Sequence, residues 1–170
     1  EVEVKSHLIE NLLEEIGDPI ELPSVVRFVA RDKFVVDTNG ELPISYLGEN
    51  FKANFLDVVE ENVSAATLKQ HKLLKRSVDR PILAALGDDD LAKIEKARVA
   101  LAHVFNYLKT ADRNQWFIFY VADAKGNVWA VGADWNDDGW NVEAPPISSP
   151  DEWHVGNRVI ISLVLSTSGM

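Results

Sequence analysis

The chain has 170 residues, of which 46% are hydrophobic and 26% are charged, so its composition is that of a folded domain rather than of a disordered chain. It contains no cysteine, which excludes disulfide bonds, thiolate catalysis and metal sites built on cysteine. The formal net charge of -10 disfavours nucleic-acid binding, and no apolar stretch reaches the roughly 20 residues that cross a bilayer.

The N-terminal segment has apolar residues at helical spacing. After Ser6, a suitable N-cap, the apolar positions are Leu8, Ile9, Leu12, Leu13 and Ile16. Gly17, Asp18 and Pro19 end this pattern, since glycine and proline interrupt the hydrogen bonding of a helix. The spacing therefore predicts an amphipathic helix over residues 6–16.

Short strands and helical segments are expected next. β-branched and aromatic residues at 25–29 and 34–36, followed by an Asn39-Gly40 turn, are typical of a β-hairpin. Helical spacing then predicts a helix over 50–61. Residues 64–78 fit either a helix or a strand, and we prefer a helix because Ser64 is a suitable N-cap. A short helix is predicted over 79–86, where Pro81 follows the first residues and Gly87 ends it.

Three consecutive carboxylates, Asp88, Asp89 and Asp90, precede an amphipathic segment. The hydrophobic stripe that follows them has helical spacing and comprises Leu91, Ile94, Ala97, Leu101, Val104, Phe105 and Leu108. Carboxylates are favourable at the positive N-terminal end of a helix. The pattern predicts one long helix over residues 89–109, with the acidic triplet as its N-cap rather than as a metal site.

The segment from residue 116 onward is typical of β-strands. Strands are predicted over 116–122, 128–135, 140–144 and 158–165, with turns at 123–126 and 136–139 and a proline-containing connection between the last two. A three-residue loop over 124–126 and a four-residue loop over 136–139 pair Val121 with Trp129 and Trp135 with Trp140. One face of this meander is then apolar and seats the helix over 89–109; it comprises Phe117, Phe119, Val121, Trp129, Val131, Ala133, Trp135, Trp140, Val142 and Ala144.

These elements predict an α+β fold over residues 1–170. We expect a C-terminal antiparallel β-meander of three or four strands packed on a long helix, preceded by an N-terminal helix, a β-hairpin and a helical segment. A subdivision into a helical and hairpin part (1–87) and a helix with the meander (88–170) is the alternative to a single domain.

The opposite face of the meander mixes aromatic, small and polar residues, with Ala130 and Gly132 as a shallow floor. Aromatic walls and a few hydrogen-bonding groups around such a floor are typical of a small-ligand or sugar site. The candidate ligand-binding residues are Trp116, Tyr120, Asp134, Asn141 and Glu143. We expect a non-enzymatic domain that binds a small ligand or a protein with this face; the alternative is that N-terminal elements cover it.

The stretch from Asp134 to Gly139 matches the first half of a calcium-binding loop. Asp134, Asn136 and Asp138 occupy its first, third and fifth positions, which supply oxygen ligands to calcium. The second half does not match, because Pro145 stands where a bidentate glutamate is required. Asn, Asp and Gly are also the residues that a hairpin turn prefers. A calcium-stabilised domain is therefore an alternative, and we expect no other cofactor.

Recognisable catalytic motifs are absent: no serine lies in a G-x-S-x-G elbow, and the glycines never fall at phosphate-binding spacing. The catalytic alternative is a small hydrolase or acid/base enzyme that uses Asp134, Glu143 and His154. A carboxylate beside an imidazole can transfer a proton, so Glu143 and His154 are the catalytic candidates in that interpretation.

A basic stretch over residues 64–87 interrupts the acidic chain. Its cations are Lys69, Lys72, Lys75, Arg76 and Arg80. We expect them to pair with the acidic residues Glu10, Glu14 and Glu15, within the chain or in a second copy as a homo-oligomer, and an anionic partner is the alternative.

The expected partners are a small molecule or a protein, with neither nucleic acid nor a membrane. We expect a cytoplasmic protein; export is the alternative, because the chain starts at Glu1 without an initiator methionine.

Overall fold

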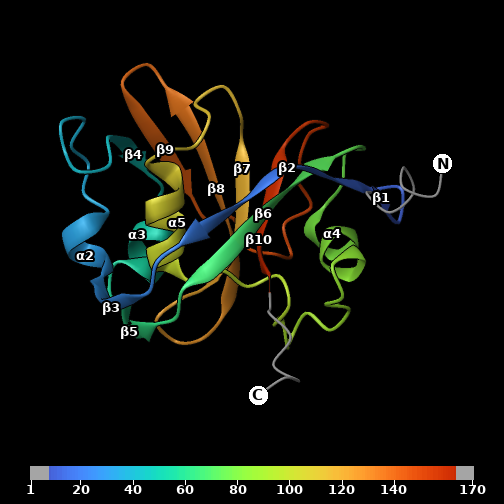
Figure 1. Cartoon of the computed structure of the whole chain (residues 1–170), viewed down its shortest axis with the longest axis horizontal. Helices are drawn as coiled ribbons and strands as arrows, with labels where there is room; N and C mark the ends of the chain where they lie inside the picture. Colours follow the sequence, from blue (N-terminus) through green and yellow to red (C-terminus); the bar gives the residue numbers. More distant parts are fainter. Residues whose placement is uncertain (1–7, 164–170) are drawn as a thin grey trace.

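The computed structural model describes residues 8–163, which form a mixed β-sheet with helices on its faces (Figure 1). The eight-stranded sheet has the order β1-β2-β6-β10-β7-β8-β9-β4. Its strands, in that order, are Leu8–Ile9, Leu13–Leu22, Ala66–Leu73, Arg158–Leu163, Phe117–Ala122, Val128–Asn136, Gly139–Glu143 and Ile44–Leu47. Strands β3 (Val25–Val29) and β5 (Val59–Val63) form a separate antiparallel pair. The helices are α2 (Ala30–Lys33), α3 (Glu49–Phe55), α4 (Asp79–Ala85) and α5 (Leu101–Leu108).

The predicted fold class is wrong. The described part of the protein is mostly β, with 42% of its residues in strands and 17% in helices, and its main element is a large mixed sheet rather than a short antiparallel meander on a long helix. The pairs β10–β7 and β4–β9 are parallel, whereas the other neighbours in the sheet are antiparallel. Strand β10 lies in the interior of the sheet and joins the β1-β2-β6 group to the β7-β8-β9-β4 group.

The predicted strand pairing between residues 117 and 143 is confirmed. Val121 lies opposite Trp129, and Trp135 lies opposite Trp140. The turn between β8 and β9 is tighter than predicted, because Asn136 pairs with Gly139 and only two residues remain between them. The alternation of side chains between the two faces of each strand, together with well-defined turns, was sufficient to specify this register.

The helix predicted over 6–16 is wrong, and Ser6 lies outside the described residues. Glu10 and Asn11 have positive φ angles of 55° and 56°, which end β1 and turn the chain into β2. The residues expected to stop a helix instead form an irregularity within β2, between Ile16 and Ile20, where Gly17 has a φ of 69°. Pairing of β2 with β6 overrides the local helical spacing.

The helix preferred over 64–78 is wrong for the same reason. Residues Ala66–Leu73 form strand β6, which pairs with β2 on one side and with β10 on the other. The basic side chains of this stretch do meet acidic ones within the chain: Lys69 forms an ion pair with Glu15, and Arg76 Nε lies 3.4 Å from Glu152 Oε1.

The long helix predicted over 89–109 is wrong, since only its last two turns, α5, are helical. Asp88 caps a loop rather than a helix: its buried carboxylate accepts hydrogen bonds from the backbone N–H groups of Glu95, Lys96 and Ala97, at 2.8–3.1 Å. The N-terminus of α5 is capped from a distant strand, because the Glu60 carboxylate accepts hydrogen bonds from the first two backbone N–H groups of the helix.

Three further predictions can be compared with the structure. The hairpin over 25–36 is wrong, because β3 pairs with β5 and residues 30–33 form α2. The helix over 50–61 is too long, since α3 ends at Phe55 and Val59 begins β5. The short helix over 79–86 is confirmed as α4. Residues 164–165 of the last predicted strand lie outside the described residues.

Each face of the sheet carries its own hydrophobic core. Helices α2, α3 and α5 with the β3–β5 pair cover one face, and the apolar residues predicted for this face all belong to that core (Figure 1). On the other face, the second core forms where α4 and the segment that follows it cover the sheet. Its members include Ile82 and Leu83 of α4, Ile94 and Ala97 of the following segment, and Ile118, Tyr120, Ala130 and Val159 of the sheet. This second core does not include Gly132, Asp134 and Glu143 of β8 and β9, which line a cavity on the same face. Among residues 8–163, no helix is long and apolar enough to span a bilayer.

Candidate functional site

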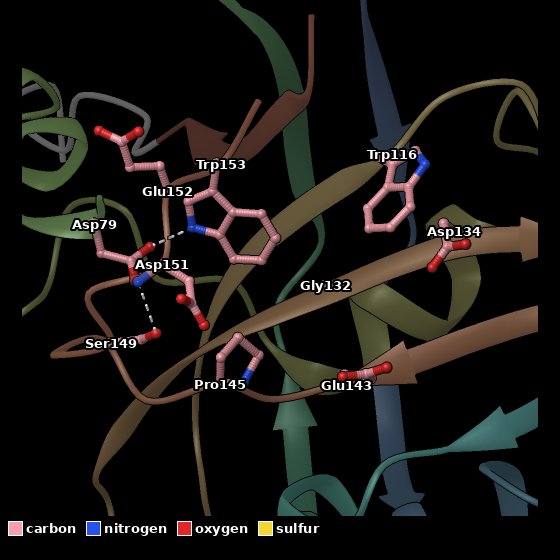
Figure 2. A pocket seen from close by; sticks show the side chains of 10 residues that line it. All are labelled: Asp79, Trp116, Gly132, Asp134, Glu143, Pro145, Ser149, Asp151, Glu152 and Trp153. Carbon is pink, nitrogen blue, oxygen red and sulfur yellow. Dashed lines mark hydrogen bonds between the residues drawn. The ribbon is translucent and has the colours of Figure 1, made fainter. Parts of the chain in front are cut away.

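A cavity of about 300 Å³ lies on the second face of the sheet, beside the part that α4 covers (Figure 2). It is lined by Asp79, Trp116, Gly132, Asp134, Glu143, Pro145, Ser149, Asp151, Glu152 and Trp153. The residues come from α4, from the residue before β7, from β8 and β9, and from the connection between β9 and β10. Segments that are distant in the sequence therefore meet at this cavity.

Strand register places the two carboxylates of the sheet next to each other. Gly132 lies opposite Glu143, and Asp134 lies opposite Asn141, so Asp134 and Glu143 are diagonal neighbours on one face of β8 and β9. Diagonal neighbours in an antiparallel pair have Cα atoms roughly 7 Å apart. Figure 2 shows both carboxylates on the side of the cavity where Trp116 lies.

Gly132 forms the floor between two indole rings. Figure 2 shows Trp116 and Trp153 on either side of this glycine. A Cβ atom at Gly132 would lie 3.1 Å from Cη2 of Trp153, closer than an ordinary van der Waals contact. The missing side chain therefore gives Trp153 its position over the strand, and Trp116 on the other side is 50% exposed.

Asp79 holds Trp153 in place. Its Oδ1 accepts a hydrogen bond of 2.8 Å from Trp153 Nε1 and one of 2.7 Å from the hydroxyl of Tyr120. The backbone of Trp153 is fixed as well, through two hydrogen bonds with Ser77, the residue two positions before α4. One wall of the cavity is thus tied to α4 and to the centre of the sheet.

The electrostatics of the cavity are acidic. Five of its lining residues are Asp or Glu and none is Lys, Arg or His. Burial raises the pKa of Asp134 above its ordinary value, and the negative charge of Glu143 raises it further. Burial also raises the pKa of Asp79, against the opposing effect of the hydrogen bonds from Tyr120 and Trp153.

Comparison of the chain with protein-family models, curated proteins and solved structures found no match.

The raised pKa of Asp79 predicts a pH dependence of stability that Asp79→Asn removes. The folded state binds this proton more tightly than the unfolded state, so the stabilisation is complete below the ordinary pKa and is lost as the pH rises through the raised one. Urea denaturation should show that the unfolding free energy of the wild type minus that of Asp79→Asn falls as the pH rises from the ordinary pKa of this carboxyl, 3.8, through the raised one. A difference that is constant or grows with pH would contradict the assignment.

Three of the five predicted ligand-binding residues, Trp116, Asp134 and Glu143, line the cavity. The other two do not. Tyr120 is fully buried beneath it, and its hydroxyl donates a hydrogen bond to Asp79. Asn141 accepts a hydrogen bond of 2.8 Å from the Ser45 hydroxyl, on the side of β9 where β4 lies.

The predicted metal ligands lie along a hairpin. Asp134 and Asn136 belong to β8, and Asp138 is in the two-residue turn, where Asp137 has a φ of 62°. In the described part of the chain, no three His, Asp or Glu side chains are grouped as a metal site requires. The calcium-stabilised domain stays a prediction.

His154 does not line the cavity, although it follows Trp153. Its backbone N–H donates a hydrogen bond of 2.9 Å to the side chain of Asn157. The structure therefore groups Asp134 and Glu143 but leaves the imidazole outside.

Sequence reasoning missed the residues that close the cavity. Asp79 was assigned only to the start of a helix, and residues 145–153 only to an irregular connection. The available signal in that connection was a tryptophan directly after two acidic residues, Asp151 and Glu152, in a segment rich in proline. Its position over Gly132 depends on the hydrogen bond to Asp79, 74 residues earlier in the chain, which no local pattern indicates.

Proposed function

We propose that this protein binds a small ligand in the cavity between Trp116 and Trp153. The observation that carries the proposal is the gap over Gly132, where two indole rings face a strand without a side chain between them. A volume of about 300 Å³ lies at the lower end of the range typical of ligand pockets. Indole rings supply apolar contact area, and the carboxylates of Asp134 and Glu143 supply polar contacts that orient a ligand.

The arrangement also explains why the two faces of the sheet differ. The face toward α5 is filled by large apolar side chains and leaves little room. On the other face, α4 and residues 94–97 cover the middle of the sheet but stop short of Asp134 and Glu143. An acidic, partly aromatic hollow next to a rigid sheet is a favourable place for a binding site, because the strands and Asp79 hold its walls before a ligand arrives.

The test is a fragment screen read by the indole N–H signals of the protein in two-dimensional NMR. The chain has five tryptophans, so the spectrum contains five such signals, which single Trp→Phe variants assign. A ligand in the cavity should shift the signals of Trp116 and Trp153 while those of Trp135 and Trp140, on the opposite face, stay in place. The library should contain neutral, cationic and anionic fragments in equal numbers.

A matched variant blocks the cavity. Gly132→Val places a β-branched side chain, of a type that strands favour, in the space that Trp153 and the cavity share, and should abolish the shifts while the Trp140 signal reports an intact core. If no fragment moves the signals of Trp116 and Trp153, or if the same fragments bind Gly132→Val equally well, the proposal is wrong.

Acid–base catalysis is a second candidate function, favoured by the adjacent carboxylates of Asp134 and Glu143. A raised pKa keeps the proton on Asp134 to higher pH, which suits a general acid, while Glu143 can serve as the base. This version of the hydrolase hypothesis does not use His154. Turnover of a bound ester or glycoside that disappears in Asp134→Asn, while binding persists, would support it; hydrolysis that survives in both Asp134→Asn and Glu143→Gln would refute it.

A further inference from the structure

Two carboxylates of the cavity lack a partner among residues 8–163. Among the described residues, neither the carboxylate of Asp134 nor that of Glu143 accepts a hydrogen bond or forms an ion pair. Their diagonal register brings two like charges together on one face of the sheet. Partial burial of Asp134 in addition disfavours the charged form of its carboxyl group. A positive group between them would relieve both effects.

The other acidic residues add to this field. Glu152 has one cation nearby, Arg76, but that side chain does not line the cavity. Oδ1 of Asp79 accepts both of the hydrogen bonds that this carboxylate makes, and Asp151 contributes a further negative charge at the rim. Because the lining contains no basic side chain, an anionic ligand would meet only repulsion.

The indole rings favour the same kind of ligand. The face of an indole attracts a cation more strongly than the faces of the other aromatic side chains do, and the interaction strengthens when the cation is desolvated. Trp116 is half-exposed and Trp153 is fixed by Asp79, so the two rings offer one accessible and one rigid surface on either side of Gly132.

We propose that the ligand of this cavity is a small organic cation, with its ammonium, quaternary ammonium or guanidinium group held by Trp116, Asp134 and Glu143. This inference rests on the proposed function and names its ligand class. The apolar part of the ligand would lie over Gly132 against Trp153.

Choline and 3,3-dimethyl-1-butanol are the decisive pair of probes, since they have the same shape and differ by one positive charge. In titrations of the full chain read by the Trp116 and Trp153 indole signals, choline should bind at least about tenfold more tightly than its neutral counterpart. Putrescine and agmatine extend the test to ammonium and guanidinium groups. Added salt should weaken the binding of all three cations, because it screens the carboxylates.

Matched variants test which negative charge is responsible for the binding of the cation. Asp134→Asn should weaken choline binding about tenfold, whereas Asp138→Asn, the same change in the exposed turn of the same hairpin, should leave it unchanged. Trp116→Ala should weaken it by a similar factor without loss of folding, because half of this side chain is already in solvent.

The outcomes separate this inference from the function on which it rests. If the neutral alcohol or methyl glucoside shifts the Trp116 and Trp153 signals as strongly as choline does, the cavity binds ligands but the cationic class is wrong. If a blocked lysine peptide binds more tightly than putrescine, the natural ligand is a lysine side chain of a partner protein, and the proposal of a free small molecule is wrong. If no member of the neutral, cationic or anionic library binds, both proposals fail.

Discussion

Asp88→Ala should lower the free energy of unfolding by about 3 kcal/mol. The Asp88 carboxylate is buried and accepts three backbone hydrogen bonds, from Glu95, Lys96 and Ala97, so its removal leaves three N–H groups without a partner in the loop that covers the second core. The buried N–H of Ala97 has no access to water and should account for a large part of the loss. Urea denaturation at neutral pH measures the effect.

Asp89→Ala is the matched control for this prediction. Asp89 is the next residue, carries the same charge and is exposed, so its replacement should change the stability by less than about 0.5 kcal/mol. Asp88→Asn should fall between the two, because the amide keeps one acceptor oxygen but presents an NH₂ group to the N–H groups around it. Equal stabilities of Asp88→Ala and Asp89→Ala would contradict the role assigned to Asp88.

Asp79→Ala should also cost about 3 kcal/mol, and it should in addition alter the cavity. The Tyr120 hydroxyl is completely buried and would lose the acceptor that it has in the wild type. Trp153 would lose its side-chain anchor and become free to leave its position over Gly132. We expect a lower unfolding free energy together with weakened binding of every ligand that shifts the Trp153 signal.

A double-mutant cycle isolates the pair. Tyr120→Phe removes the hydroxyl, so Asp79→Ala should be less costly in that background than in the wild type. Asp79→Asn keeps an acceptor for both donors and should retain most of the stability at neutral pH. If the effects of Asp79→Ala and Tyr120→Phe are additive, the hydrogen bond between them does not contribute as described.

The register between residues 117 and 143 was predictable because its information is local. Alternating side chains and two turns with Asn, Asp and Gly specify which residues face each other, and these turns connect strands that are neighbours in both sequence and sheet. The same register predicted that Asp134 and Glu143 share a face. Asp134 and Glu143 do line the cavity, whereas Tyr120 and Asn141, predicted for the same face, do not.

The rest of the fold depended on contacts between distant residues. Leu12, Leu13 and Ile16 have a helical spacing, but residues 13–16 pair with β6, and this pairing determines the outcome. The acidic triplet is compatible with a helix cap. In the structure, however, the Asp88 carboxylate accepts hydrogen bonds from the backbone of a loop, and Glu60 caps the helix α5. Asp79 and Trp153 meet for a similar reason: their hydrogen bond depends on where α4 packs, which is a tertiary property.

The interior position of strand β10 has a consequence for biosynthesis. Strands β1, β2 and β6 are linked through the sheet to β7, β8, β9 and β4 only by β10, whose residues, 158–163, are the last to be made among the strands of the sheet. During translation the two groups of strands therefore cannot complete the sheet until residues 158–163 have left the ribosome. Until then β6 and β7 each expose an unpaired edge, so folding is expected to finish late and the growing chain to need protection from aggregation.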